Sequence, residues 1–224
     1  KTFEQTRARL SRRVVALKQQ GMDVEQLQSK VNVIEREDLP LAQDDDAQAQ
    51  MQAALAELEE QIGLPGVKKK VRDLIDVLEV QKLRGQQKPL GIHFVFTGNP
   101  GTGKTTIARI LARVFHGIGL LPSEKLIETD RSGMVAGYVG QTATKVNQIV
   151  DRAMGGVLFV DEAYALKQRA DDSFGQEAID TLLKRMEDDR GKFVVIAAGY
   201  KKEMREFLNT NSGLMSRFSD YIDF

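Results

Sequence analysis

The feature that most constrains the fold of this chain is the segment Gly98-Asn99-Pro100-Gly101-Thr102-Gly103-Lys104-Thr105. It matches the pattern G-x-x-x-x-G-K-[ST], follows the apolar, strand-like residues 92–97 and precedes the helix-like residues 106–112. The order strand, glycine loop, helix distinguishes a phosphate-binding loop from a chance match. Glycines allow several backbone N–H groups to point inward, and the helix N-terminus adds positive potential. The segment therefore predicts a site for a nucleoside triphosphate.

Within this loop, Lys104 is expected to reach the β- and γ-phosphates, and the Thr105 hydroxyl is expected to hold Mg²⁺. The ligands predicted from the loop itself are a nucleoside triphosphate and Mg²⁺. The alternative is a glycine-rich turn that binds nothing, and the flanking strand and helix argue against it. The residues predicted to bind the nucleotide here are Gly98, Asn99, Pro100, Gly101, Thr102, Gly103, Lys104, Thr105 and Thr106.

A second motif is the run Gly156-Val157-Leu158-Phe159-Val160-Asp161-Glu162, in which four apolar residues precede two acids. It predicts a buried strand that delivers two carboxylates to the edge of a sheet. Asp161 is expected to hold Mg²⁺, mostly through its waters, and Glu162 to orient and deprotonate the water that attacks the γ-phosphate. Taken alone, such a run is most often an ordinary strand end. Its position after a phosphate loop favours the catalytic interpretation.

Apolar, strand-like runs alternate with helical segments from residue 62 onward. Alternation of this kind is typical of parallel βαβ units. We therefore expect an α/β fold, with a doubly wound, five-stranded parallel sheet, helices on both faces and the phosphate loop after the first strand. The expected strands are 92–97, 125–130, 157–161, 193–198 and 220–224.

Residues 1–61 are expected to form a separate helical segment that precedes the α/β domain of residues 62–224. Their apolar residues recur at helical spacing and predict helices over about 2–20, 24–37 and 47–61, the third capped by the acidic cluster 44–46. Two interpretations are open for this segment. It is either an arm for partner docking or oligomerisation, or a small bundle that packs against the main domain.

Composition narrows the classes of function. The chain contains no cysteine, which excludes disulfides and thiolate metal sites. Its 32 basic and 32 acidic residues give a net charge of zero, which argues against a nucleic-acid partner. No apolar stretch approaches the ~18 residues of a membrane span, and a cytoplasmic location is expected. The two histidines, His93 and His116, are expected to be packing or surface residues rather than metal ligands.

Several motifs together resemble the AAA+ ATPases. They are the phosphate loop, Gly-Gly-Val-Leu-Phe-Val-Asp-Glu-Ala-Tyr (155–164), Phe-Gly-Gln-Glu-Ala (174–178) and Val-Ile-Ala-Ala-Gly-Tyr (195–200). More narrowly, the chain is similar to the CbxX/CfqX subfamily, which includes red-type Rubisco activases, the stage V sporulation protein K type and the cytosolic ATPases of type VII secretion. The resemblance covers 62–224. It implies a ring, most often of six subunits, that hydrolyses ATP to remodel or thread a protein client through a central pore.

The resemblance also assigns residues. Arg217 matches the arginine finger, which completes the neighbouring subunit's site in trans; the alternative is a surface arginine that pairs with Asp220. Tyr138 and Val139 match the aromatic and aliphatic residues of the central pore loop, and the alternative is that Tyr138 packs on the domain. These roles imply a homo-oligomer and a protein client whose identity the sequence leaves open.

Two further positions follow from the same resemblance. Gly63 lies in the segment that faces the adenine in this family, although a turn between helices explains a glycine there almost as well. Tyr200 stands where many AAA+ proteins carry an asparagine that senses the γ-phosphate, so no sensing role is assigned to it.

The resemblance implies a helical lid after the fifth strand, and the 224 residues do not include one. We therefore expect this chain to be a weak ATPase without a stable hexamer. Two other classes of function are open: a small-molecule kinase, or an interaction scaffold with vestigial hydrolysis. Full turnover by a dilute monomer would favour the kinase. Partner binding that is unchanged by Lys104→Ala would favour the scaffold.

Overall fold

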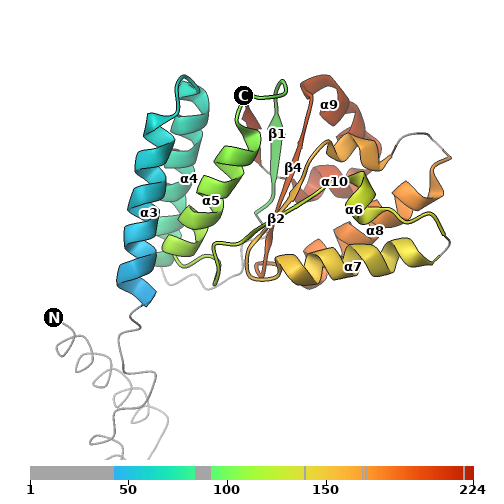
Figure 1. The fold of residues 1–224 in the computed structure, drawn as a ribbon, viewed down its shortest axis with the longest axis horizontal. Helices are drawn as coiled ribbons and strands as arrows, with labels where there is room; N and C mark the ends of the chain where they lie inside the picture. Colours follow the sequence, from blue (N-terminus) through green and yellow to red (C-terminus); the bar gives the residue numbers. More distant parts are fainter. Residues whose placement is uncertain (1–42, 84–91, 139, 168, 170, 219) are drawn as a thin grey trace, which may run out of the picture. The chain divides into compact units, whose positions relative to one another are not determined.

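A computed structural model of the protein describes residues 43–83, 92–138, 140–167, 169, 171–218 and 220–224. A five-stranded, wholly parallel sheet with the order β2-β3-β4-β1-β5 lies at the centre (Figure 1). Each predicted strand is confirmed, with ends that shift by no more than two residues. The strands are β1 (Phe94–Thr97), β2 (Leu126–Thr129), β3 (Val157–Val160), β4 (Val194–Gly199) and β5 (Asp220–Asp223).

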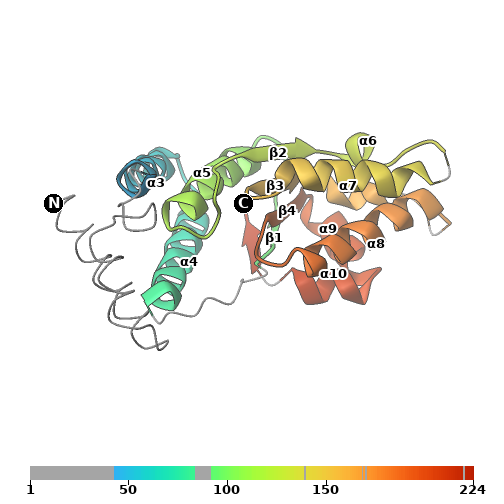
Figure 2. The same cartoon turned by 90° about the horizontal axis from the view of Figure 1, so that it is seen from below.

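Helices cover both faces of the sheet, as the α/β pattern predicts (Figure 2). One face carries α3 (Gln43–Glu60), α4 (Pro65–Leu83) and α5 (Lys104–Gly117), whose apolar residues share a core cluster. The other face carries α6 (Arg131–Met134), α7 (Gln141–Ala153), the short 3₁₀ helix η1 (Ala163–Leu166), α8 (Ser173–Asp188), α9 (Lys201–Asn209) and α10 (Ser212–Arg217).

The two core clusters follow directly from the alternation of side chains along each strand. In β1, Phe94 and Phe96 face the α5 side of the sheet, whereas Val95 between them faces the α7–α8 side. Because both faces are covered, all four residues of β1 and all four of β3 are buried. This double burial explains why the strands appear in the sequence as continuous apolar runs rather than as alternating patterns.

The predicted helices over 2–20 and 24–37 lie outside the described residues. The third predicted helix is observed as α3, and the acidic residues 44–46 lie in its first turn rather than before it. Negative charge in the first turn complements the partial positive charge of a helix N-terminus. Residues Ala47–Phe224 form one compact unit, in which Met51 and Leu58 of α3 are buried with the apolar face of α5. The predicted division at residue 61 stays a prediction.

Candidate nucleotide-binding site

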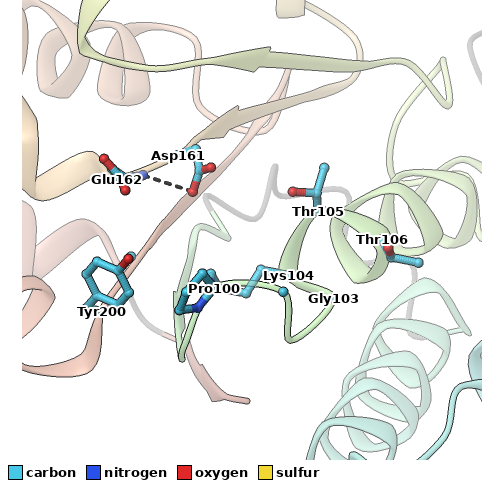
Figure 3. Close-up of a pocket in the computed structure, with 10 residues that line it drawn as sticks. Pro100, Gly103, Lys104, Thr105, Thr106, Asp161, Glu162 and Tyr200 are labelled. Atoms are coloured by element: carbon cyan, nitrogen blue, oxygen red, sulfur yellow. Dashed lines mark hydrogen bonds between the residues drawn. The ribbon is translucent and has the colours of Figure 1, made fainter.

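The carboxyl ends of β1, β3 and β4 meet at one edge of the sheet and surround a cavity of about 380 Å³ (Figure 3). Segments far apart in the sequence converge here because parallel strands all end at the same edge. The cavity is lined by six of the predicted nucleotide-binding residues, both predicted acids, the last residue of β4 and the residue that follows it. Its lining residues are Pro100, Gly101, Gly103, Lys104, Thr105, Thr106, Asp161, Glu162, Gly199 and Tyr200.

The glycines of the loop are needed for its backbone shape. Gly101 and Gly103 have φ values of +74° and +90°, in the left-handed region that side chains disfavour. Gly103 is the N-cap of α5, and it has no side chain that could satisfy the first-turn N–H groups of that helix. These N–H groups lack acceptors within the helix, so they face the cavity as donors for an anion.

The Lys104 side chain turns back onto the same loop. Its ammonium donates to the carbonyls of Gly98 at 2.9 Å and Asn99 at 2.7 Å, which leaves one of its three protons for a further acceptor. Burial lowers the pKa of Lys104, and the nearby carboxylate of Asp161 partly offsets that effect. The loop thus holds a cation at the position where the sequence predicted contact with phosphate.

Asp161 and Glu162 follow β3 directly, and both side chains are exposed at the cavity. The Asp161 N–H donates to the Thr129 carbonyl at 2.8 Å, and the Glu162 N–H donates to the Asp161 carboxylate at 3.0 Å. Glu162 has φ +46° and ψ +45°, a left-handed conformation that costs a residue with a side chain about 1–3 kcal/mol. The kink turns the chain out of the strand, so that two adjacent carboxylates take different directions.

The donor set fits the predicted metal ion. Thr105 and Asp161, from α5 and the end of β3, line the same cavity. A hydroxyl and a carboxylate oxygen are hard ligands of the kind that Mg²⁺ prefers, and that ion usually keeps several waters.

Gly199 and Tyr200 also line the cavity, although the sequence predicted no role for either. The Gly98 N–H donates to the Gly199 carbonyl at 3.1 Å, which joins the phosphate loop to β4. A Cβ atom on Gly199 would lie 2.7 Å from the Tyr164 ring, so only glycine fits there. Their position gives the signal, because Gly199 ends a buried parallel strand and Tyr200 follows it directly.

The Tyr164 phenol interacts with the Glu162 carboxylate, and its ring centroid lies 5.9 Å from that of Tyr200. Burial raises the pKa of the Tyr164 phenol to about 12, and the negative charge of Glu162 contributes to the same shift. The phenol therefore stays protonated at neutral pH and is a hydrogen-bond donor beside the proposed general base.

Other predicted nucleotide contacts lie outside the cavity. Three residues of the loop do not line the cavity: Gly98, Asn99 and Thr102. The Thr102 hydroxyl instead donates to the Asn99 carbonyl at 2.8 Å. Gly63 lies in the turn between α3 and α4 with φ +76° and does not line the cavity either. The neighbouring Ile62 is 99% exposed. The structure therefore brings the phosphate-facing residues together, but not Gly63.

Arg217, the last residue of α10, lies at the amino edge of the sheet. It precedes β5, whose first residue, Asp220, pairs in register with the first residue of β1, Phe94. Its guanidinium lies 3.4 Å from the Glu187 carboxylate, and its buried Nε has no hydrogen-bond partner among the described residues. The phosphate loop follows the opposite end of β1, so Arg217 and its own cavity lie at opposite edges.

Tyr138 lies in the connection between α6 and α7 and is 74% exposed. Val139, the other residue predicted for the pore loop, lies outside the described residues. The side chain of Tyr138 is thus available on the surface rather than packed in the core. Among the described residues, no helix combines the length and the apolar character that crossing a bilayer requires.

The family model described as "ATPase family associated with various cellular activities (AAA)" matches residues 94–224. The ESX-1 secretion system protein EccA1 of Mycobacterium tuberculosis (strain ATCC 25618 / H37Rv) is 50% identical over 179 residues, which are 76% of this chain and 31% of that protein. The ESX-3 secretion system protein EccA3 of Mycolicibacterium smegmatis (strain ATCC 700084 / mc(2)155) is 49% identical over 177 residues, 76% of this chain and 29% of that protein.

The chain therefore spans about a third of the length of these relatives. Among solved structures, the FIGL-1 AAA domain in complex with ADP is 22% identical, with a TM-score of 0.47, and the match covers 72% of this chain and 53% of that one.

Proposed function

The chain belongs to the family of ATPases associated with various cellular activities (AAA), and we propose that it is an ATP hydrolase that acts on Mg-ATP in the cavity at the carboxyl edge of its sheet. The observation that carries this proposal is the convergence of Lys104 and Thr105 with Asp161 and Glu162 on one cavity. A cation, a hydroxyl and two carboxylates that line one cavity are the groups that phosphoryl transfer to water requires.

Each side chain has a separate part in the proposed reaction. Lys104 and the first N–H groups of α5 bind the β- and γ-phosphates. Thr105 and Asp161 hold Mg²⁺, which when bound neutralises charge on those phosphates. Glu162 orients the attacking water and takes up its proton at a carboxylate oxygen. The different directions of Asp161 and Glu162 support this division, because one carboxylate serves the metal while the other remains available to water.

Arg217 is proposed to complete the site of a neighbouring subunit. Its place at the edge opposite its own cavity supports action in trans. Its side chain is 28% exposed, so part of the guanidinium is accessible to a neighbouring subunit. A guanidinium stabilises the charge that develops on the transferred phosphoryl group. Action in trans calls for a ring, and resemblance to the CbxX/CfqX subfamily supports six subunits.

The proposed client is a protein that Tyr138 grips. An exposed aromatic side chain on a loop, 74% accessible, can hold an extended peptide without reading its sequence. The relatives are named as secretion system proteins, which supports a client handled by a secretion system. The proposal places the domain in the cytoplasm, where ATP is available.

The test is Glu162→Gln, measured by phosphate release and by calorimetry with Mg-ATP. We expect ATP to bind as before, while turnover falls by about 10² or more because the general base is lost. Glu128→Gln is the matched control, since Glu128 is an exposed acid on β2 whose surface ion pair with Arg109, at 2.7 Å, lies outside the cavity. Undiminished ATPase activity in Glu162→Gln would overturn the assignment.

A further inference from the structure

Arg131, the first residue of α6, donates hydrogen bonds to three acceptors. Its guanidinium donates to the carbonyl oxygens of Ala165 at 3.0 Å and Leu166 at 2.5 Å, and to the Asp172 carboxylate at 2.7 Å. The Arg131 and Asp172 side chains are only 24% and 10% exposed. One terminal nitrogen, Nη1, makes all three bonds, and charge-assisted bonds of this kind are strong. The contact joins α6 to η1 and to the start of α8.

The η1 carbonyls that Arg131 holds belong to the turn that begins at Glu162. The Ala165 N–H donates to the Glu162 carbonyl at 2.7 Å, and the Ala165 carbonyl in turn accepts from Arg131. Only one peptide turn therefore separates Arg131 from the proposed general base. Glu162 has a left-handed backbone, which persists only where the surroundings enforce it, and the anchored η1 turn is part of those surroundings.

Arg131 is joined just as closely to the segment that leads to Tyr138. Its carbonyl accepts the Val135 N–H at 2.8 Å, and Lys145 of α7 donates to the Val135 carbonyl at 3.1 Å. The Ala136 N–H donates to the hydroxyl of Thr142, a fully buried residue, at 3.1 Å. Residues 131–136 thus form one braced unit that ends two positions before Tyr138.

Close backbone contacts pack the elements around Arg131 tightly against one another. A Cβ atom on Gly175 of α8 would lie 1.9 Å from the Leu166 carbonyl oxygen. A Cβ atom on Gly133 of α6 would lie 2.2 Å from the Thr129 hydroxyl at the end of β2. Elements packed this tightly cannot deform gradually, so a displacement of one is passed to the next.

We propose that Arg131 is a positioning residue that couples Glu162 to the loop bearing Tyr138. The proposal rests on the proposed function, in which Glu162 engages water beside the γ-phosphate and Tyr138 grips the client. A change at Glu162 displaces the carbonyls of Ala165 and Leu166, and α6 follows through Arg131. By linkage, force on Tyr138 acts on Glu162 along the same path.

A second guanidinium in the structure supplies a matched control for a purely structural ion pair. Arg185 of α8 donates to Asp189 and to Asp151 of α7, both at 2.7 Å, and its side chain is 18% exposed. These bonds, together with one to Asn147 at 3.1 Å, join α7 to α8 and do not involve η1 or α6. Arg185→Gln removes the same charge and a comparable set of bonds without touching the proposed connection.

The chain contains no tryptophan, so Tyr138→Trp introduces a single fluorescent reporter at the loop. Fluorescence is compared between Mg-AMP-PNP and Mg-ADP in this background and in versions that also carry Arg131→Gln, Arg131→Met or Arg185→Gln. We expect a difference between the two nucleotides in the background and in Arg185→Gln, and loss of most of it in Arg131→Gln. In the chain with Tyr138 intact, Arg131→Gln should lower kcat about tenfold while KM for ATP changes less than about twofold, the pattern of a misplaced catalytic group.

Each outcome decides the question. A full fluorescence difference in Arg131→Gln overturns the coupling and leaves the proposed function standing. The absence of a difference in the background, with both nucleotides bound, overturns a nucleotide-driven loop and the coupling with it. If circular dichroism shows that Arg131→Gln does not fold, Arg131→Met takes its place, because methionine keeps much of the side-chain bulk but has no donor. A reduced difference in Arg131→Met then supports the proposal, and a full one overturns it.

Discussion

At the scale of single residues, the backbone conformation of Glu162 determines the directions of the Asp161 and Glu162 carboxylates. A regular strand continuing through Asp161 and Glu162 would place one of them against a face of the sheet. The left-handed conformation at Glu162, with φ +46°, instead ends the strand there and keeps both carboxylates at the cavity. Its cost is of the order that functional sites commonly carry, about 1–3 kcal/mol. The surrounding contacts, those of Arg131 among them, have to compensate it.

His93 illustrates a titratable residue that serves stability. It is 2% exposed, and its Nδ1 accepts the Val195 N–H at 3.0 Å, which requires a neutral ring. Burial lowers the pKa of His93 from 6.5 to about 4, and the positive charges of Arg217 and Arg190 contribute. The unfolded chain therefore binds a proton that the folded chain rejects throughout this window, so stability falls as the pH is lowered from about 6.5 to 4.

We predict that the free energy of unfolding drops by up to about 3 kcal/mol between pH 7 and pH 4 because of His93. Urea unfolding at several pH values measures this, and His93→Gln, which keeps an acceptor for the Val195 N–H, should flatten the curve across the window. Aspartates with lowered pKa values, such as Asp189 and Asp223, lose their contribution only below about 3.8 and so fall outside it. Parallel curves for the two proteins would contradict the prediction.

At the scale of elements, the strand order sets the width of the site. β4 lies between β1, which precedes the phosphate loop, and β3, which precedes the two acids. Neighbouring strands lie about 4.8 Å apart, so the loop and the acids are about 10 Å apart, enough for a phosphate and a metal ion. The strand between them ends in Gly199, whose lack of a side chain keeps this space open while Tyr164 packs close behind.

The packing of α3 on α5 has an equally specific requirement. A Cβ atom on Gly117, the last residue of α5, would lie 2.3 Å from the Met51 Cβ and 2.8 Å from the Ala47 carbonyl oxygen. We predict that Gly117→Ala forces the two helices apart and lowers the free energy of unfolding by about 1–3 kcal/mol. Denaturant titration provides the measurement.

Gly66→Ala in α4 is the control for that change. A Cβ atom there meets nothing within 4 Å, and the better helix propensity of alanine should leave stability unchanged or raise it by up to about 1 kcal/mol. Equal stability of Gly117→Ala and the unaltered chain would show that α3 does not approach α5 this closely.

At the scale of the whole molecule, the two parts of the proposed reaction lie at opposite edges of one sheet. The cavity lies beyond the carboxyl ends of the strands, and Arg217 lies before the amino end of β5. A single copy cannot bring them together without breaking the sheet. Copies arranged head to tail can do so, since a heterologous contact repeated with rotation closes into a ring.

Mixing two inactive variants tests this arrangement. Arg217→Ala keeps its own cavity but lacks the finger, whereas Lys104→Ala keeps the finger but lacks the phosphate contact. We predict that each alone releases little phosphate and that a mixture at high protein concentration recovers a fraction of the activity, because some contacts pair an intact cavity with an intact arginine. A mixture no more active than its parts, in a protein whose activity rises with concentration, would contradict action in trans.

The sequence by itself determined the features that depend on neighbours along the chain. The phosphate loop, the acid pair after β3 and the five strands were all predictable, because glycine spacing and apolar runs record local conformation and burial. Tertiary structure alone decided the strand order, the entry of Gly199 into the cavity and the absence of Gly63 from it. It also gave Arg131 partners 34 and 41 residues away. The periodicity of apolar residues indicates that one face of an element is buried, but it does not indicate which element covers that face. The covering element is determined by packing between segments that are distant in the sequence.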